Sequence, residues 1–243
     1  ESARSYFPPG QKWIAGREID YAWSAFLLPY LEEGAIYDSL DLDRSYLDPV
    51  NVNAVGQVVS AYLCPSMSSS DKQRVGQIIP DFNDQPGLTL GGIDYLGISG
   101  PDKDETFPGQ SAQYGPQRGV LIGTKGLEYG DTLLHPPRMK VAAISDGMSK
   151  TLCVSECTGR GVEGDGDPNG AWVSGKNITH LNGVPNGKSG DKSWTNERMY
   201  SEHPGGCHGL FCDGSVQMLI TDIDQSIVWA IASRNGEELV ELP

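Results

Sequence analysis

The sequence contains no apolar run long enough to cross a membrane, and it has few basic residues. A transmembrane helix needs about 20 consecutive apolar residues, and no stretch of the 243 residues approaches that length. Because the chain begins with Glu1 and not Met, we expect it to be the soluble part of a processed or trimmed protein. The formal net charge is −14. Nucleic acids and anionic membranes select for basic surfaces, so we expect neither as a partner and regard cations as the more natural small ligands.

The sequence also lacks the short motifs of common catalytic and metal sites. It has no Walker loop and no H-E-x-x-H motif. The stretch GISG at 97–100 is one residue short of a G-x-S-x-G nucleophile elbow. No two cysteines form a C-x-x-C pair, which disfavours zinc ribbons and thioredoxin-like sites. Any catalytic triad would have to be assembled from scattered residues, so we expect no enzyme.

The five cysteines are arranged as two close pairs and one residue left over. Cys153 lies near Cys157, and Cys207 lies near Cys212. An even number of cysteines in an exported, loop-rich protein predicts disulfides, and not a metal cluster. Bridges within each pair and cross-pairing between the two segments are both open. Cys64 has no obvious partner, and a cysteine in a segment preceding this chain is one possibility.

Glycine and proline are abundant, which predicts many turns and little long helix. The 31 Gly and 16 Pro approach a fifth of the residues. Polar stretches predict long surface loops at about 66–92, 101–118 and 176–200. Helices and strands do not alternate regularly, which disfavours a doubly wound sheet. We therefore predict an α+β fold, with an antiparallel sheet, short helices and long loops, forming a single domain over residues 1–243.

Several elements are predicted from local patterns. Apolar runs on both sides of Asp213-Gly214 indicate a β-hairpin. A helix is predicted over 224–234, with Asp224 as its N-cap. Near the N-terminus, the alternation around Trp23 predicts a strand up to about Leu28, followed by a short helix over 29–40. Further short strands are predicted in the stretches GIDYLGISG and GAWVSG.

The stretch HPGGCHGLFCDGSVQML admits a metal or catalytic interpretation and a structural one. In the first, His203 acts with Asp213, or a zinc ion is bound by residues of suitable types: His203, Cys207, His208 and Cys212. However, Cys207 and Cys212 are an odd number of residues apart and point to opposite faces of a strand. The structural interpretation is a hairpin in which His203 hydrogen-bonds a backbone group or a nearby carboxylate. We favour the hairpin.

A second candidate site is the stretch EGDGDPNGAW. Asp165, Asp167 and Asn169, followed by a glycine, satisfy the D-x-[DN]-x-[DN]-G spacing that turns three oxygen ligands towards one Ca²⁺ ion. Lys176 stands where an EF-hand would place its bidentate Glu, so this is no EF-hand. Glu163 and backbone carbonyls near Ala171 would have to complete the site. The alternative is a solvated acidic turn.

Five motifs in order along the chain resemble one large bacterial family. They are FPPG at 7–10, LLPYLEE at 27–33, YLCPS at 62–66, ISDGMSKTL…SE at 144–156 and SEHPGG…DGSV at 201–216. Together they resemble the prepilin-like proteins with a prepilin-type processing-associated H-x9-DG domain, also described as domain of unknown function 1559 with a solute-binding label. The resemblance implies a type IV pilin-like or pseudopilin-like head, anchored by an N-terminal helix that this chain lacks. The four paired cysteines are more than the family pattern includes.

The resemblance implies a non-enzymatic structural subunit of the bacterial cell envelope. Its head would face the extracytoplasmic side, and its partners would be other pilin-like subunits or copies of itself, held through the absent helix. The only membrane contact would be that anchor. The alternative is an extracellular module that binds a solute, saccharide or peptide, because five Trp and ten Tyr lie among long polar loops. An envelope hydrolase is a third hypothesis, for which we find no motif.

Overall fold

The largest element of the protein is a five-stranded sheet. The computed structural model describes residues 6–14, 19–68, 73–75, 89–108, 110–123, 139–160, 170–187 and 198–238. The strand order is β7-β5-β6-β8-β9, and the bounds are β5 (Tyr95–Pro101), β6 (Leu152–Glu156), β7 (Ile178–Leu181), β8 (Gly206–Phe211) and β9 (Val216–Ile220). All neighbouring strands are antiparallel except β5 and β7, which are parallel. The predicted α+β class is confirmed.

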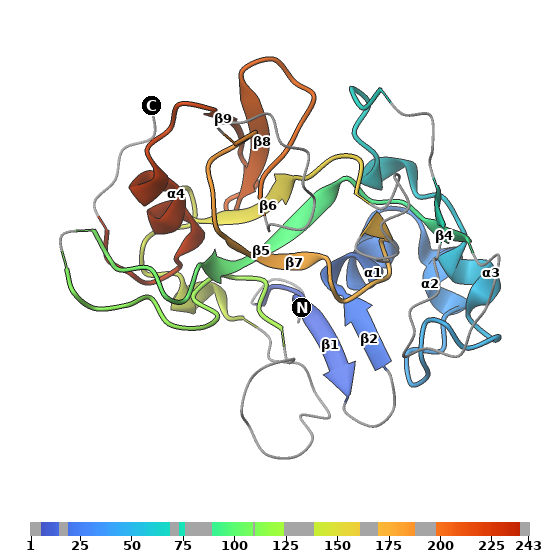
Figure 1. The fold of residues 1–243 in the computed structure, drawn as a ribbon. Coiled ribbons are helices and arrows are strands. Elements are labelled where there is room, and N and C mark those ends of the chain that lie inside the picture. The colour runs from blue at the N-terminus through green and yellow to red at the C-terminus, as the bar shows by residue number, and fades with distance from the viewer. Residues whose placement is uncertain are drawn as a thin grey trace.

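Short elements flank this sheet. Two further strand pairs are present, β1 (Gln11–Ile14) with β2 (Ile19–Ala22), and β3 (Gln73–Val75) with β4 (Thr89–Gly91). The helices are α1 (Trp23–Leu27), α2 (Gly34–Asp38), α3 (Val52–Val55) and α4 (Gln225–Ala232), with 3₁₀ turns η2 (Leu28–Tyr30), η3 (Ser60–Tyr62) and η4 (Val141–Ala143). In Figure 1, α4 lies on one side of the sheet and the N-terminal helices lie on the other. No described helix is long and apolar enough to span a membrane.

Among the described residues, two buried clusters form the core. The larger one joins the N-terminal elements to the central strands, and it includes Trp172, whose indole N–H donates to the Gln57 carbonyl at 2.9 Å. The smaller one lies where α4 packs against β5, β6 and β7, and it includes Phe211 of β8. Burying each large apolar side chain contributes about 1.5–3 kcal/mol. Both clusters draw on β6, because Leu152 belongs to the smaller cluster and Val154 to the larger.

Both predictions that rest on turn and capping chemistry are confirmed. The β8–β9 hairpin turns at Asp213-Gly214, where Asp213 Oδ1 accepts the Ser215 N–H at 2.9 Å and Gly214 has φ 89°. Helix α4 begins after Asp224, whose carboxylate accepts the Ser226 N–H at 2.8 Å. The helix ends at Ala232, two residues before the predicted end, because Ser233 is extended.

Three local predictions are wrong. The chain leaves β2 at Ala22 and becomes helix α1 where a strand up to Leu28 is predicted. Its first three residues are all buried, so tertiary packing overrides the alternating pattern. Within the predicted loops at 66–92 and 176–200 the structure has β3, β4 and β7. The stretch GAWVSG makes only isolated bridges, Gly92 with Ala171 and Tyr21 with Ser174.

The predicted disulfides are not formed. All five cysteines are buried free thiols. Cys153 and Cys212 lie on neighbouring segments and hydrogen-bond to each other, which with burial raises the pKa of Cys212. Bridges within each sequence pair are therefore not the arrangement that the fold favours. The contact of Cys153 with Cys212 instead corresponds to the cross-pairing alternative, because the β6–β8 register brings one member of each pair together.

Candidate functional site

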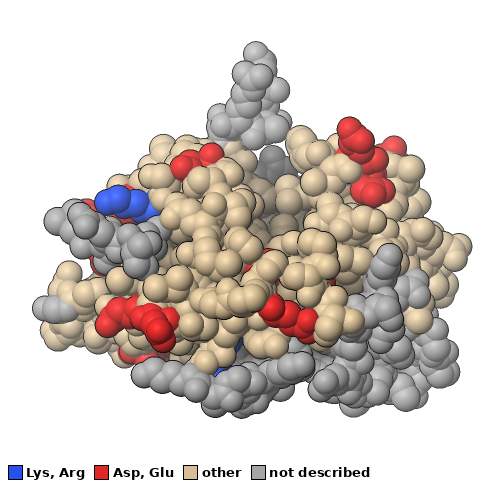
Figure 2. All heavy atoms as spheres, turned by 90° about the horizontal axis from the view of Figure 1, so that it is seen from above, with Lys and Arg blue, Asp and Glu red and all other residues tan. Residues whose placement is uncertain are grey.

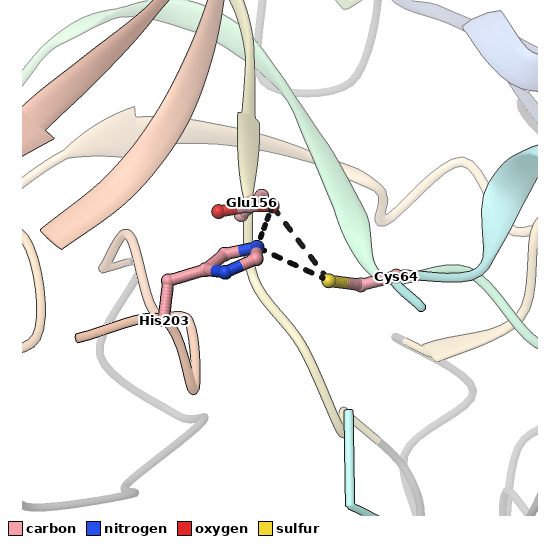
Figure 3. Close-up of side chains that lie close together, drawn as sticks. All are labelled: Cys64, Glu156 and His203. Carbon is pink, nitrogen blue, oxygen red and sulfur yellow. Dashed lines mark hydrogen bonds and ion pairs between the residues drawn. The ribbon is translucent and has the colours of Figure 1, made fainter. Parts of the chain in front are cut away.

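Three segments that are far apart in the sequence meet at one polar cluster. Cys64 follows η3, Glu156 ends β6, and His203 precedes β8. Figure 3 shows their side chains pointing towards one another from three directions. The same three segments carry the motifs YLCPS, SE and SEHPGG. Three of the five motifs thus meet at this cluster.

The buried carboxylate of Asp94 holds the Cys64 segment in position. One oxygen accepts the Cys64 N–H at 2.9 Å, and the other accepts the Gly159 N–H at 3.0 Å. The backbone of Asp94 also accepts from Cys157 and donates to the Tyr62 carbonyl, both at 2.8 Å. Since Asp94 directly precedes β5, it ties the Cys64 segment to the end of β6.

Glu156 is the centre of the cluster. It lies opposite Tyr95 in the β5–β6 register, and its side chain is 4% exposed. Its Oε2 accepts the backbone N–H of His208 at 2.7 Å, which fixes the carboxylate against β8. Its Oε1 is left facing the Cys64 thiol and two imidazoles. Burying a carboxylate costs free energy unless it is paired and hydrogen-bonded. The contacts with these neighbours therefore offset the cost of burying Glu156.

His203 is held beside Glu156 by the chain that leads into β8. The backbone N–H of His203 donates to Ser201 Oγ at 3.2 Å. The preceding residue, Glu202, accepts the N–H and the hydroxyl of Ser68 at 2.7 and 2.9 Å. This second tie binds the segment after Cys64 to the segment around His203. The imidazole itself is partly exposed, with 24% of its side-chain surface accessible.

The three functional atoms form a compact triangle. His203 Nε2 lies 3.2 Å from Glu156 Oε1 and 3.8 Å from Cys64 Sγ, and Sγ lies 3.7 Å from the same Oε1. The hydroxyl of Ser66 lies 3.0 Å from both Sγ and Nε2. All three atoms therefore lie close enough to contact one small ion or ligand atom.

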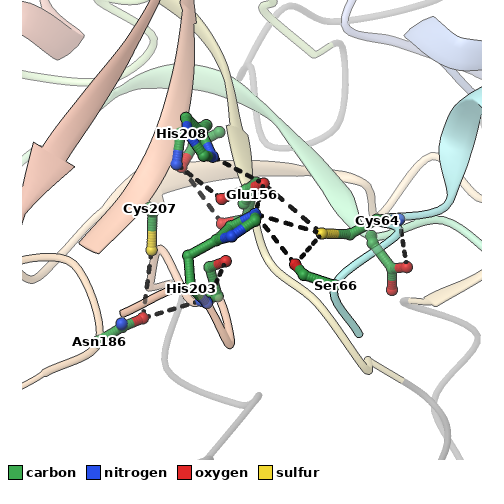
Figure 4. A network of polar contacts seen from close by, with 10 residues as sticks. Cys64, Ser66, Glu156, Asn186, His203, Cys207 and His208 are labelled. Carbon is green, nitrogen blue, oxygen red and sulfur yellow. Dashed lines mark hydrogen bonds and ion pairs between the residues drawn. The ribbon is translucent and has the colours of Figure 1, made fainter. Parts of the chain in front are cut away.

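A second layer of polar groups surrounds this triangle (Figure 4). His208 Nδ1 lies 3.3 Å from Glu156 Oε1, and its ring meets that of His203 edge-on, with centroids 4.6 Å apart. Next to it on β8, the Cys207 thiol donates to Asn186 Oδ1 at 3.3 Å. Asn186 Oδ1 also accepts the Ser201 N–H at 2.8 Å.

The electrostatics of the cluster disfavour thiolate formation in the free protein. Burial, with smaller contributions from the carboxylates of Glu156 and Asp94, raises the pKa of Cys64, although hydrogen bonds from Ser66 oppose this. Burial also raises the pKa of Tyr95, which lies opposite Glu156, to about 12. A cation at the cluster would reverse the effect on the thiol.

The geometry does not fit a nucleophilic triad. In such a triad the base uses one ring nitrogen for the nucleophile and the other for the orienting acid. Here the same atom, His203 Nε2, contacts both Cys64 and Glu156. Convergence of a thiol, an imidazole nitrogen and a carboxylate oxygen on one point suits coordination of a single ligand better.

Of the residues singled out in the sequence, some lie in the cluster and others do not. His203 does contact a nearby carboxylate, Glu156, as the hairpin interpretation expects. Asp213 is not part of the cluster, because its carboxylate caps the hairpin turn at Ser215. Cys212 contacts Cys153 instead of the histidines. The predicted calcium ligands Asp165, Asp167 and Asn169 lie outside the described residues, so that site stays a prediction.

Sequence reasoning missed Cys64 and Glu156. They are separated from His203 by 139 and 47 positions, so no spacing pattern connects them. One signal was available: Cys64 is the cysteine left over after the two pairs are removed, and it lies within a family motif, as Glu156 and His203 do.

Comparison with known proteins identifies one family. A family model, SBP_bac_10, described as "Protein of unknown function (DUF1559)", matches residues 1–226. No curated protein and no solved structure gives a significant match. The match covers nearly the whole chain, including all three residues of the triangle.

Proposed function

The chain belongs to the DUF1559 family of proteins of unknown function, and from this premise we propose that it is the extracytoplasmic, non-enzymatic head of a pilin-like or pseudopilin-like protein. Its partners would be other pilin-like subunits or copies of itself. The support from the structure is an apolar face on strand β9, together with the ordered motifs of the chain. The shared use of His203 Nε2 supports the non-enzymatic part of the proposal, because it does not fit a triad.

Strand β9 stands at the end of the sheet order and exposes one apolar face. Its sequence, VQMLI, alternates so that Leu219 is buried in the core while Val216, Met218 and Ile220 are 61%, 40% and 41% exposed. Leu210 of β8 lies opposite Val216 and is 37% exposed. We call Leu210, Val216, Met218 and Ile220 the β9 face.

Such a face suits protein assembly. Among the described residues, no strand pairs with the outer side of β9. Edge strands of monomeric proteins are usually protected by charges or proline, and VQMLI contains neither. Contiguous exposed apolar side chains mark interaction surfaces. The β9 face therefore supports a head that associates with another subunit.

The charge of the head makes this apolar face more important. The net charge is −14, and Figure 2 shows several groups of Asp and Glu and little Lys or Arg on one face of the molecule. Like-charged heads repel one another. Association between copies would then depend on apolar contact, and it would strengthen as salt screens the repulsion.

The test is to place charge on the β9 face. The variant Val216→Lys/Met218→Lys changes residues that are already exposed, so it should fold and should lose self-association in sedimentation and in cross-linking of the full-length protein in cells. Val50→Lys is the matched control, because Val50 is 54% exposed and lies elsewhere. Association that is unchanged by the double substitution, or lost equally in Val50→Lys, would contradict the proposal.

The second candidate is a module that binds a solute or saccharide, which the family label SBP_bac_10 favours. Several of the aromatic residues that suggest this function lie in the core: Trp172, Tyr21 and Tyr114 are at most 1% exposed. A ligand panel of saccharides and peptides distinguishes the two functions, because a binding module gains thermal stability from its ligand even when the β9 face is changed.

The calcium proposal at Asp165, Asp167 and Asn169 is independent of both functions. We expect millimolar Ca²⁺ to raise the melting temperature of the wild type and not that of Asp165→Ala/Asp167→Ala. If calorimetry detects no heat of Ca²⁺ binding at millimolar concentration, the site does not exist.

A further inference from the structure

We propose that Cys64, Glu156 and His203 form a binding site for one divalent transition-metal ion of the zinc type. The site lies where the segment after η3, the end of β6 and the segment before β8 meet (Figure 3). It shares no residue with the predicted calcium loop or with the β9 face.

The spacing of the three atoms matches tetrahedral coordination. Zinc binds sulfur at about 2.3 Å and imidazole nitrogen or carboxylate oxygen at about 2.0–2.1 Å. At a tetrahedral angle, these lengths place N and O about 3.3 Å apart and S about 3.5–3.6 Å from either. The observed separations are 3.2 Å for N–O, 3.8 Å for S–N and 3.7 Å for S–O. One ion could therefore enter with shifts of only tenths of an ångström.

The charges also match a divalent ion. A bound Cys64 thiolate and the Glu156 carboxylate each supply one negative charge, and a neutral His203 supplies none. One M²⁺ ion thus makes the cluster neutral, which matters because Cys64 and Glu156 are 5% and 3% exposed and buried charge is costly. Binding replaces the thiol proton, which is released to solvent.

The ligand types select among metals. Thiolate and imidazole favour zinc-type ions over Mg²⁺ and Ca²⁺, which take oxygen ligands. Three protein ligands leave one tetrahedral position for a water molecule or for His208, whose Nδ1 lies 3.3 Å from the same Glu156 oxygen. The partly exposed His203 gives an ion access from the surface.

The ligands are held in place without a metal, which reduces the cost of binding. Asp94 accepts the Cys64 N–H, the His208 N–H donates to Glu156 Oε2, and Ser201 accepts the His203 N–H. Each ligand thus has its own backbone or side-chain support. Of the three bonds, only that from the His208 N–H reaches a ligating group itself, and support of that kind typically contributes a factor of about 10–100 to metal affinity.

The test uses the purified, reduced chain, stripped with a chelator and titrated with Zn²⁺ in competition with a chromophoric chelator. We expect one ion per chain, and Co²⁺ in its place should give a thiolate-to-metal charge-transfer band. Cys64→Ser should abolish that band. Cys64→Ser, Glu156→Gln and His203→Gln should each weaken Zn²⁺ binding by more than about 100-fold, since losing a direct ligand costs more than losing its support.

The matched control is Cys212→Ser, because Cys212 is 7% exposed, as buried as Cys64, and lies outside the cluster. It should keep both the band and the affinity. Circular dichroism without metal shows whether each variant folds, and Glu156→Gln preserves the shape of the side chain if Cys64→Ser does not fold. A wild type without the cobalt band, a band that survives Cys64→Ser, or equal loss in Cys212→Ser would overturn the proposal and leave the cluster as a hydrogen-bonded link between segments.

Discussion

Asp94 is the residue on which the geometry of the cluster depends most. Its two carboxylate oxygens accept two backbone N–H groups, those of Cys64 and Gly159, and it is fully buried. Each N–H would lose its partner if the carboxylate were removed. Unsatisfied buried groups cost about 1–3 kcal/mol each.

We therefore expect Asp94→Ala to lower the free energy of unfolding by roughly 2–6 kcal/mol, measured by urea denaturation. Asp94→Asn should be less damaging, because its amide oxygen can still accept one of the two N–H groups. Equal stability of Asp94→Ala and the wild type would show that the Cys64 segment is held by other contacts.

His180 of β7 predicts a pH dependence of stability. Burial lowers its pKa from the ordinary 6.5, and the smaller effects of Asp102 and Lys103 oppose each other. The unfolded chain therefore takes up a proton near pH 6.5 that the folded chain resists. The folded state loses stability as the pH falls through that value, and it has the full contribution above it.

The expected result is a larger loss of stability for the wild type than for His180→Gln between about pH 7.5 and about pH 5.5. Urea denaturation at both pH values measures the two losses, and their difference isolates His180 from His203 and His208. Parallel losses in the two proteins would show that His180 titrates normally.

At the scale of elements, the β8–β9 hairpin depends on the close approach of its strands at Gly206. A Cβ atom there would lie 2.1 Å from the Leu219 carbonyl oxygen, which is backbone and cannot move aside alone. The two strands pair at Gly206 and Ile220. A side chain at this position would push β9 away from β8.

We expect Gly206→Ala to destabilise the protein by about 1–3 kcal/mol, measured by thermal or urea unfolding. Gly34→Ala is the control, because Gly34 lies in α2 with open space around it. Alanine there should be neutral or should stabilise by up to about 1 kcal/mol. If both substitutions behave alike, the strand contact at Gly206 is not tight.

For the whole molecule, the proposed location predicts which reagents reach the head. Lys103 and Lys150 are exposed, so an amine reagent that cannot cross membranes should label both in intact spheroplasts carrying the full-length protein. Mass spectrometry identifies the labelled sites, and a cytosolic protein serves as the unlabelled reference. Labelling only after lysis would place the head in the cytoplasm and remove the pilin-like proposal.

The sequence by itself determined the features that depend on neighbouring residues. The hairpin at Asp213-Gly214 and the N-cap at Asp224 are correct because turn and cap chemistry act over two or three positions. The mixed class and mainly antiparallel sheet follow from composition and from the order of elements. The motifs also indicated the DUF1559 family, which the family model confirms.

The tertiary structure alone decided the features that depend on distant partners. The segment after Ala22 is helical because its first three residues are all buried, and β7 is a strand because it pairs with β5. A local pattern shows neither contact. The cluster is the clearest case. His203 could be singled out in the sequence, but Cys64 and Glu156 are 92 positions apart. They meet because β5 pairs with β6 and Asp94 ties the Cys64 segment to that pair.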